Sequence, residues 1–355
     1  MTVFWSILAA ILIFGFLILA HEAGHYFVAR RCGVTIEEFS VGMGPKLFSR
    51  TSKKYGTVFS IRALPIGGYV AMVGENEESD AEGSLSSKPV WQRMLVIAAG
   101  ALVNLLIGFV IMLLIVCISA SQGTLASNIV AGFREGATSC AEGGLQVNDR
   151  IVRVEDVSIH TGEELTYEIA NQGDKPLTLT VIRDGEKVVL ENIVFPTFED
   201  QGVTFGDYDF FIYAERSPSV WKVLEITYFR SISLIKMVWD SLIGLISGRF
   251  GIQTLSGPVG VTAAVTEVIV ESGWSASQIV NYVLYITAVI SINLGIFNLI
   301  PFPALDGGRL LFLCIEGVRR KKISPDIEGK IHLVGIALLM MLMLFVVCKD
   351  IVSLF

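Results

Sequence analysis

Four long apolar stretches, separated by mixed and polar regions, dominate the pattern of hydrophobic and polar positions. They run from Val3 into residue 21, and over residues 94–120, 279–300 and 331–347. Each stretch is long and apolar enough to span, or nearly span, a hydrocarbon core of about 30 Å. The pattern therefore predicts a polytopic α-helical membrane protein with about four spanning helices.

The region between the first two stretches has a different pattern. Residues 36–75 are rich in glycine and β-forming residues, which predicts short strands with tight turns in a β-rich membrane segment. An exposed strand edge can hold an unwound peptide as an added strand. We therefore assign Gly67 and Gly68, in the stretch ALPIGGYV, to substrate binding. A structural hairpin without substrate contact is the alternative that the sequence leaves open.

A small soluble domain is expected between the second and third stretches. Residues 144–154 predict a turn followed by a strand, residues 163–172 predict a helix, and two strands at 177–183 and 187–194 are joined through Asp184–Gly185, a favoured hairpin turn. The expected order along the chain is a first membrane half (1–120), this inserted α+β domain (121–215), an amphipathic interfacial segment (216–275) and a second membrane half (276–355).

Composition and charge agree with this division. Hydrophobic residues make up 52% of the chain and charged residues 17%. Nine Lys and Arg between Arg30 and Arg93, and four more at residues 319–322, place both segments in the cytoplasm by the positive-inside rule. The termini and the α+β domain are then extracytoplasmic, and the β-rich segment is cytoplasmic. Residues 121–215 hold 17 Asp and Glu against six Lys and Arg, so nucleic acid is not an expected partner.

The sequence HEAGH at residues 21–25, at the end of the first apolar stretch, is the strongest chemical signal. On a helix, His21 and His25 stack on one face and can bind one Zn²⁺. Glu22 lies about 100° around the helix, where it can reach a metal-bound water instead of the metal. Ionisable residues inside a membrane are functional by default. A polar helix end that reaches the interface is the alternative.

A third zinc ligand is needed, and Asp306 in the sequence NLIPFPALDGG (298–308) is the best candidate. It follows the third apolar stretch at the expected cytoplasmic side. The other histidines are poor candidates, because His160 lies in the outward domain and His332 is expected at a distant depth in the fourth stretch. An Asp that only caps the next helix, near Arg309, is the alternative.

These motifs together resemble the bacterial site-2 proteases, the intramembrane zinc metalloproteases of the M50 class, and in particular the sigma-E-regulating type. HEAGH, ALPIGGYV, LSGPVG (255–260) and NLIPFPALDGG carry the resemblance, and residues 121–215 resemble a single PDZ domain. It implies one Zn²⁺ per chain, with His21, His25 and Asp306 as ligands and Glu22 as the general base. The positions that it implies for substrate binding are Asn293, Asn298, Pro301 and Pro303.

The function that this resemblance implies is cleavage of the transmembrane segments of single-span proteins in the bacterial inner membrane. Anti-sigma-factor-like proteins, or signal-peptide remnants, would be cut after a first cut by another protease. The PDZ-like domain would reject substrates with large outer domains. A membrane metal-ion transporter, with intramembrane His and Asp forming an ion pathway, is the alternative. The oligomeric state stays open.

Overall fold

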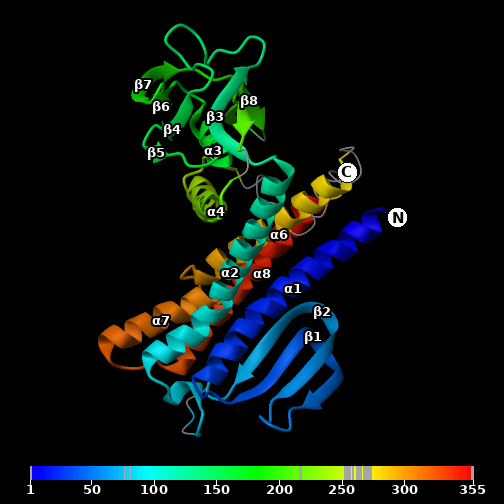
Figure 1. Cartoon of the computed structure of the whole chain (residues 1–355). Helices are drawn as coiled ribbons and strands as arrows, with labels where there is room; N and C mark the ends of the chain where they lie inside the picture. The colour runs from blue at the N-terminus through cyan, green and yellow to red at the C-terminus, as the bar shows by residue number, and fades with distance from the viewer. Residues whose placement is uncertain are drawn as a thin grey trace. The chain divides into compact units, whose positions relative to one another are not determined.

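The chain forms two compact units, Met1–Gly108 with Ser256–Phe355 and Phe109–Leu255. The computed structural model describes residues 2–75, 77, 79, 81–200, 202–215, 218–251, 257, 260, 266 and 274–352. The helices and strands of both units are shown in Figure 1. The four-part division expected from the sequence stays a prediction.

Long helices make up most of the first unit. They are α1 (Thr2–Arg31), α2 (Val90–Gln122, which continues into the second unit), α6 (Ala276–Leu299), α7 (Asp306–Arg319) and α8 (Pro325–Val352), with a short 3₁₀ turn η1 at Leu85–Ser87. Among the described residues, four helical segments are long and apolar enough to cross a membrane: Leu8–Arg31, Val90–Gln122, Ser277–Leu299 and Asp326–Asp350. The prediction of about four spanning helices is therefore confirmed.

Small residues let these helices approach closely. A side chain at Gly24 of α1 would place its Cβ 2.7 Å from the carbonyl oxygen of Ala99 in α2, and one at Gly295 of α6 would lie 3.0 Å from that of Ala101. Close backbone approach at small residues is the usual way in which membrane helices associate, because lipid gives no hydrophobic force between them. Helices α1 and α6 therefore both pack closely against α2 near Ala99 and Ala101.

The β-rich segment forms an antiparallel sheet of two long strands, β1 (Ile36–Thr51) and β2 (Val58–Met72). Residues 38–41 pair on one side with 58–61 and on the other with 68–71, while 58–61 also pair with 48–51. The two strands therefore bend into four rows, and residues 68–71 form one outer edge of the sheet. The prediction of short strands was wrong, because glycines with positive φ, such as Gly42 (83°), bend the strands instead of ending them.

Glu38 is the polar centre of this sheet. Its carboxylate accepts hydrogen bonds from Ser60 Oγ at 2.6 Å and from Arg62 Nη2 at 3.0 Å, and it pairs with Lys46 Nζ at 2.9 Å. Burial alone would raise the pKa of Glu38, but these contacts outweigh it and lower the pKa from 4.5 to about 2. Glu38 is therefore charged in the folded sheet at neutral pH and ties three of its rows together.

The second unit is an α+β domain followed by a long helix. Its elements are β3 (Ala126–Phe133), β4 (Arg150–Val154), β5 (Val157–Ser158), α3 (Gly162–Gln172), β6 (Leu177–Arg183), β7 (Glu186–Ile193), β8 (Thr197–Asp200), β9 (Val203–Gly206), β10 (Phe210–Ala214) and α4 (Val220–Ile246). The main sheet has the order β10-β3-β4-β6-β7, with β5 paired to β4. The core contains fully buried Ile151, Leu165, Leu179 and Phe210.

Local sequence signals account for several of these elements. Helix α3 begins with a capping box, in which the Thr161 hydroxyl accepts from the Glu164 backbone and the Glu164 carboxylate accepts from the Thr161 backbone. Asp184 and Gly185 have φ of 52° and 87°, as the predicted two-residue hairpin turn requires. The strand predicted within residues 144–154 is confirmed by β4, and the helix predicted at 163–172 is confirmed by α3.

The predicted amphipathic segment (216–275) contains helix α4, and one face of this helix contacts α3. Arg230 donates to Glu163 with Nε to Oε2 at 2.9 Å, and Lys236 Nζ lies 2.7 Å from Glu168 Oε1. The interfacial position of α4 stays a prediction. The rest of the segment lies largely outside the described residues, as does the LSGPVG motif except for Gly257 and Gly260.

Candidate metal centre

Helix α1 presents His21 and His25 on one face. The helix continues through the motif to Arg30 and Arg31, two cations that favour the C-terminal end of a helix dipole. The two imidazoles lie edge to face with ring centroids 4.7 Å apart, and their Nε2 atoms are 3.1 Å from each other. A spacing of four residues on a regular helix fixes this proximity without help from the rest of the fold.

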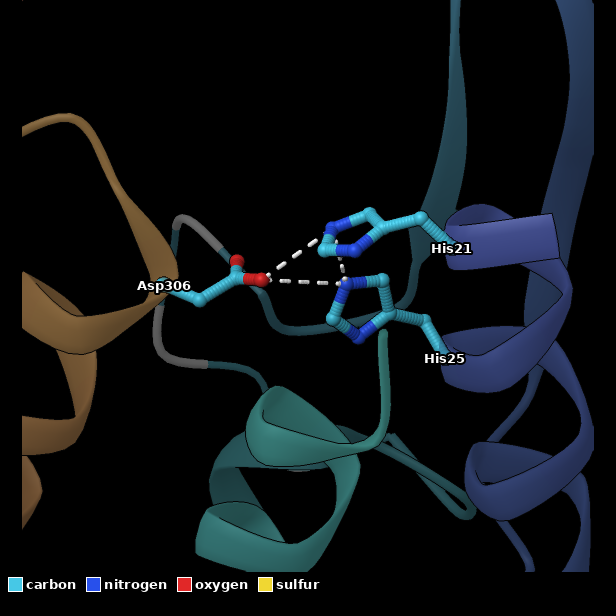
Figure 2. Close-up of side chains that lie close together, drawn as sticks. All are labelled: His21, His25 and Asp306. Atoms are coloured by element: carbon cyan, nitrogen blue, oxygen red, sulfur yellow. Dashed lines mark hydrogen bonds and ion pairs between the residues drawn. The ribbon is translucent and has the colours of Figure 1, made fainter. Parts of the chain in front are cut away.

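Asp306 reaches the same place from a distant part of the sequence. It is the first residue of α7, directly after the non-helical residues 300–305. Its Oδ2 lies 3.2 Å from His21 Nε2 and 3.3 Å from His25 Nε2, as Figure 2 shows. The structure therefore brings the three residues together, while their role as ligands stays a prediction.

The three side chains fit a zinc ion. Their ligand atoms all lie within 4.8 Å of one another, with separations of 3.1, 3.2 and 3.3 Å. Bonds of about 2.0–2.1 Å in tetrahedral geometry place neighbouring ligand atoms about 3.3 Å apart. Asp306 Oδ2 is buried and makes no hydrogen bond with any described residue, so it lacks the partner that a buried carboxylate oxygen needs. A cation held between the three side chains would supply that partner.

Neighbouring groups orient the two histidines. His25 Nδ1 donates to the carbonyl oxygen of Val96 in α2 at 2.8 Å, which leaves the lone pair on Nε2 directed toward Asp306. The side-chain amide of Asn298, near the end of α6, lies 3.5 Å from His21 Nδ1. Both histidines thus have a partner on the ring nitrogen that faces away from the shared site.

Because Gly100 in α2 has no side chain, there is room for the two imidazoles beside it. A Cβ at this position would lie 2.6 Å from His21 Cε1 and closer still to His25 Nε2. Any side chain there would collide with both rings. Gly100 was not among the predicted site residues, although a glycine within an apolar helix is a signal of close packing.

Glu22 faces the β1–β2 sheet. A Cβ at Gly68 in β2 would lie 3.3 Å from Glu22 Cγ, so the backbone of this outer sheet row passes directly beside the carboxylate. Gly67 has a φ of 82°, and a Cβ on it would meet Met43 within the sheet. Gly68 therefore lies beside the candidate site, whereas Gly67 shapes the strand.

The remaining predicted residues lie on α6 and in the loop that follows it. Helix α6 ends at Leu299, and Pro301 and Pro303 belong to the non-helical residues before α7. Asn293 Oδ1 is buried without a hydrogen-bond partner among the described residues. Asn293 lies about 140° around the helix from Asn298, so the two amides face different directions. The substrate-binding role of these residues stays a prediction.

His332 is not at a distant depth, and that expectation was wrong. Its Nδ1 accepts a hydrogen bond from the Ala304 N–H at 2.9 Å, two residues before Asp306. His332 instead lies in the first two turns of α8, against the loop that carries Asp306.

Comparison with known proteins agrees with this geometry. The model of Peptidase family M50 matches residues 9–342. A protein of Clostridium perfringens named as a zinc metalloprotease is 34% identical, with 98% of each chain covered. The regulator of sigma-W protease RasP of Bacillus subtilis is 30% identical, with 99% of each chain covered, and a zinc metalloprotease RasP of Shouchella clausii is 31% identical over the same shares.

The match extends over both the helix that carries His21 and His25 and the segment that carries Asp306. It also includes all of the β-rich segment and the α+β domain. The chain therefore belongs to peptidase family M50, and it is a zinc-dependent metalloendopeptidase and a multi-pass bacterial membrane protein.

Proposed function

We propose that this chain cleaves transmembrane segments of single-span membrane proteins inside the bilayer, with His21, His25 and Asp306 as its zinc ligands. The observation that carries the proposal is the triangle of ligand atoms, 3.1 to 3.3 Å on each side, built on a helix that is apolar enough to span a membrane. A metal-ion transporter, the earlier alternative, is set aside because the chain belongs to a peptidase family.

Glu22 is the proposed general base. Zinc bound to the three side chains would polarise a peptide carbonyl and make water more acidic. Glu22 lies about 100° around α1 from His21, so its carboxylate sits beside the shared site without being a ligand. It would take the proton of the attacking water and pass it to the leaving amine.

A cavity of about 300 Å³ in the first unit, with charged side chains in its wall, is the proposed route for water. Ion pairs line it, including Arg93 with Glu316 and Arg309 with Glu75. Arg309 is one turn after Asp306 in α7, so the cavity approaches the candidate site along this helix. These charged walls keep water available at a place where the surrounding helices are apolar.

The outer row of the β1–β2 sheet is the proposed holding site for substrate. Hydrolysis needs an exposed peptide bond, and a helical substrate shields its bonds by its own hydrogen bonds. Residues 68–71 pair with 38–41 on one side, so the other edge offers backbone groups to an extended peptide next to Glu22. Asn298, Pro301 and Pro303 would hold the unwound segment from the opposite side.

The proposal also covers the orientation of the chain in the membrane and its choice of substrate. The basic clusters favour a cytoplasmic position for the residue 36–75 segment and an extracytoplasmic position for residues 121–215. The β-sheet with one packed helix supports a PDZ-like domain, and Asn148 has a φ of 72° where the PDZ motif has Gly. A relative named as a regulator of sigma-W protease supports anti-sigma-factor-like substrates.

Zinc analysis combined with cleavage tests the assignment of roles. His21→Ala, His25→Ala and Asp306→Ala should each lower zinc content and remove cleavage of a single-span model substrate. Glu22→Gln should keep zinc at the parent level and abolish cleavage, because it removes a base and no ligand. Full zinc occupancy in Asp306→Ala would contradict the ligand set, and normal cleavage by Glu22→Gln would contradict the base.

A further inference from the structure

The loop that carries Asp306 has an unusual backbone conformation. Ala304 has a φ of 81°, in the left-handed region that residues with a side chain rarely adopt. Such a conformation persists only where the surrounding structure holds it in place. Because Asp306 follows two residues later, the conformation of Ala304 directs the carboxylate toward His21 and His25.

Helix α8 supplies the contacts that hold this loop. The Ala304 N–H donates to His332 Nδ1 at 2.9 Å. Gly335, three residues further along α8 and on the same face, has no side chain, and a Cβ there would lie 2.6 Å from Pro303 Cβ. The loop therefore rests on a short surface of α8 that offers one hydrogen-bond acceptor and one close backbone contact.

The role of His332 depends on its Nδ1 as an acceptor. Since Nδ1 accepts, the ring carries its proton on Nε2 in the neutral form. Nε2 is buried without a hydrogen-bond partner among the described residues, with Glu328 Oε1 3.7 Å away, and His332 is one of the residues that line the cavity. The Phe312 ring packs against the imidazole with centroids 6.0 Å apart. His332 thus binds the loop through Nδ1 and is not one of the three clustered side chains that could hold a metal ion.

We infer that His332 is a positioning residue for the zinc site: its Nδ1 fixes Ala304 in the left-handed conformation and thereby holds Asp306 at ligand distance from His21 and His25. The inference rests on the proposed ligand role of Asp306. Without the acceptor, the partly buried Ala304 N–H has no partner and the loop relaxes toward a different φ. Asp306 then moves away from the histidines.

Two amide variants isolate this effect in the full-length detergent-solubilised protein. His332→Asn places Oδ1 where Nδ1 lies, whereas His332→Gln places its acceptor one carbon further along the side chain. Loss of a group that orients a metal ligand weakens metal binding about 10- to 100-fold. We expect His332→Gln to weaken zinc binding by at least about tenfold, and His332→Asn to stay close to the parent.

The readouts are the zinc dissociation constant, measured with a competing chelator, and the visible absorption spectrum of the cobalt-substituted protein. The Gln variant should show an altered cobalt spectrum, because ligand geometry changes, while the Asn variant should keep the parent spectrum. Parent-like zinc affinity and cobalt spectrum in His332→Gln would overturn the inference, as would equal loss in both variants. Asp306→Ala is measured in parallel: if it keeps zinc, the ligand assignment itself fails, and if it loses zinc while His332→Gln does not, only the role of His332 fails.

Discussion

Adding one methyl group at Gly100 should disable the metal centre while leaving the helix intact. The Cβ of Gly100→Ala would lie 2.6 Å from His21 Cε1 and closer to His25 Nε2. Carbon atoms prefer separations of about 3.5–4.0 Å, so the rings must retreat by about 1 Å. A zinc–nitrogen bond of about 2.0–2.1 Å does not survive a displacement of that size.

The expected result is zinc binding weakened by more than about 100-fold, since displacing a ligand exceeds the 10- to 100-fold effect of losing a group that only orients one. Alanine favours a helix over glycine by about 1 kcal/mol, so α2 itself should not be weakened by the change. The assay is zinc content per chain, together with the dissociation constant measured against a chelator and cleavage of a single-span substrate.

Gly108→Ala is the matched control on the same helix. Its Cβ would lie 2.5 Å from Ile292 Cγ1, so the variant strains the packing of α2 against α6 without touching either histidine. Gly15→Ala, with open space around its Cβ, controls for glycine replacement itself. If Gly100→Ala bound zinc like the parent, or if Gly108→Ala lost zinc equally, direct collision with the imidazoles would be refuted as the cause.

The α6–α7 loop, the β1–β2 sheet and the α+β domain each give a further expectation. Pro301→Ala combined with Pro303→Ala should lower turnover with zinc content unchanged, measured by kinetics and metal analysis. The pKa of Glu38 is lowered from 4.5 to about 2, so its stabilisation of the sheet is complete above about pH 5 and is lost as the pH falls toward 2. Hydrogen exchange in residues 58–62 should show that loss in the parent and not in Glu38→Gln. Replacing residues 126–196 by a flexible linker should retain cleavage of a short substrate and relax rejection of one with a large outer domain.

Each of these expectations has a clear contrary result. Normal turnover in the double proline variant would make the helix break purely structural. A pH profile of sheet protection that is the same in Glu38→Gln and the parent would remove Glu38 as its cause. Unchanged rejection of the large substrate after the deletion would exclude the α+β domain from substrate selection.

The features that local geometry determines were predictable from the sequence. The pairing of His21 with His25 requires only a helix, which an uncharged apolar run already indicates. The turn at Asp184–Gly185 was predictable for the same reason, because both residues tolerate positive φ. The four spans follow from length and hydropathy, which depend on no long-range contact.

The features that depend on long-range packing were not predictable. The sequence of residues 36–75 indicated strands and glycines, but not that β1 pairs with β2 twice and leaves residues 68–71 at an edge. The contact of His332 with Ala304 joins residues 28 positions apart, and no local pattern encodes it. Gly100 was one small residue among many in an apolar helix, and only the packed structure shows what it faces.

The three candidate ligands differ in how firmly the fold fixes them. His21 and His25 share one regular helix, and His25 is also bound to Val96, so their separation changes little unless α1 itself deforms. Asp306 depends on the six non-helical residues 300–305 and on what α8 offers to them. Substitutions that act on this loop should therefore alter zinc affinity far more than equally conservative ones along the exposed face of α1. The geometry of the candidate metal centre is thus adjustable at Asp306, and this residue lies on the same helix that leads into the cavity.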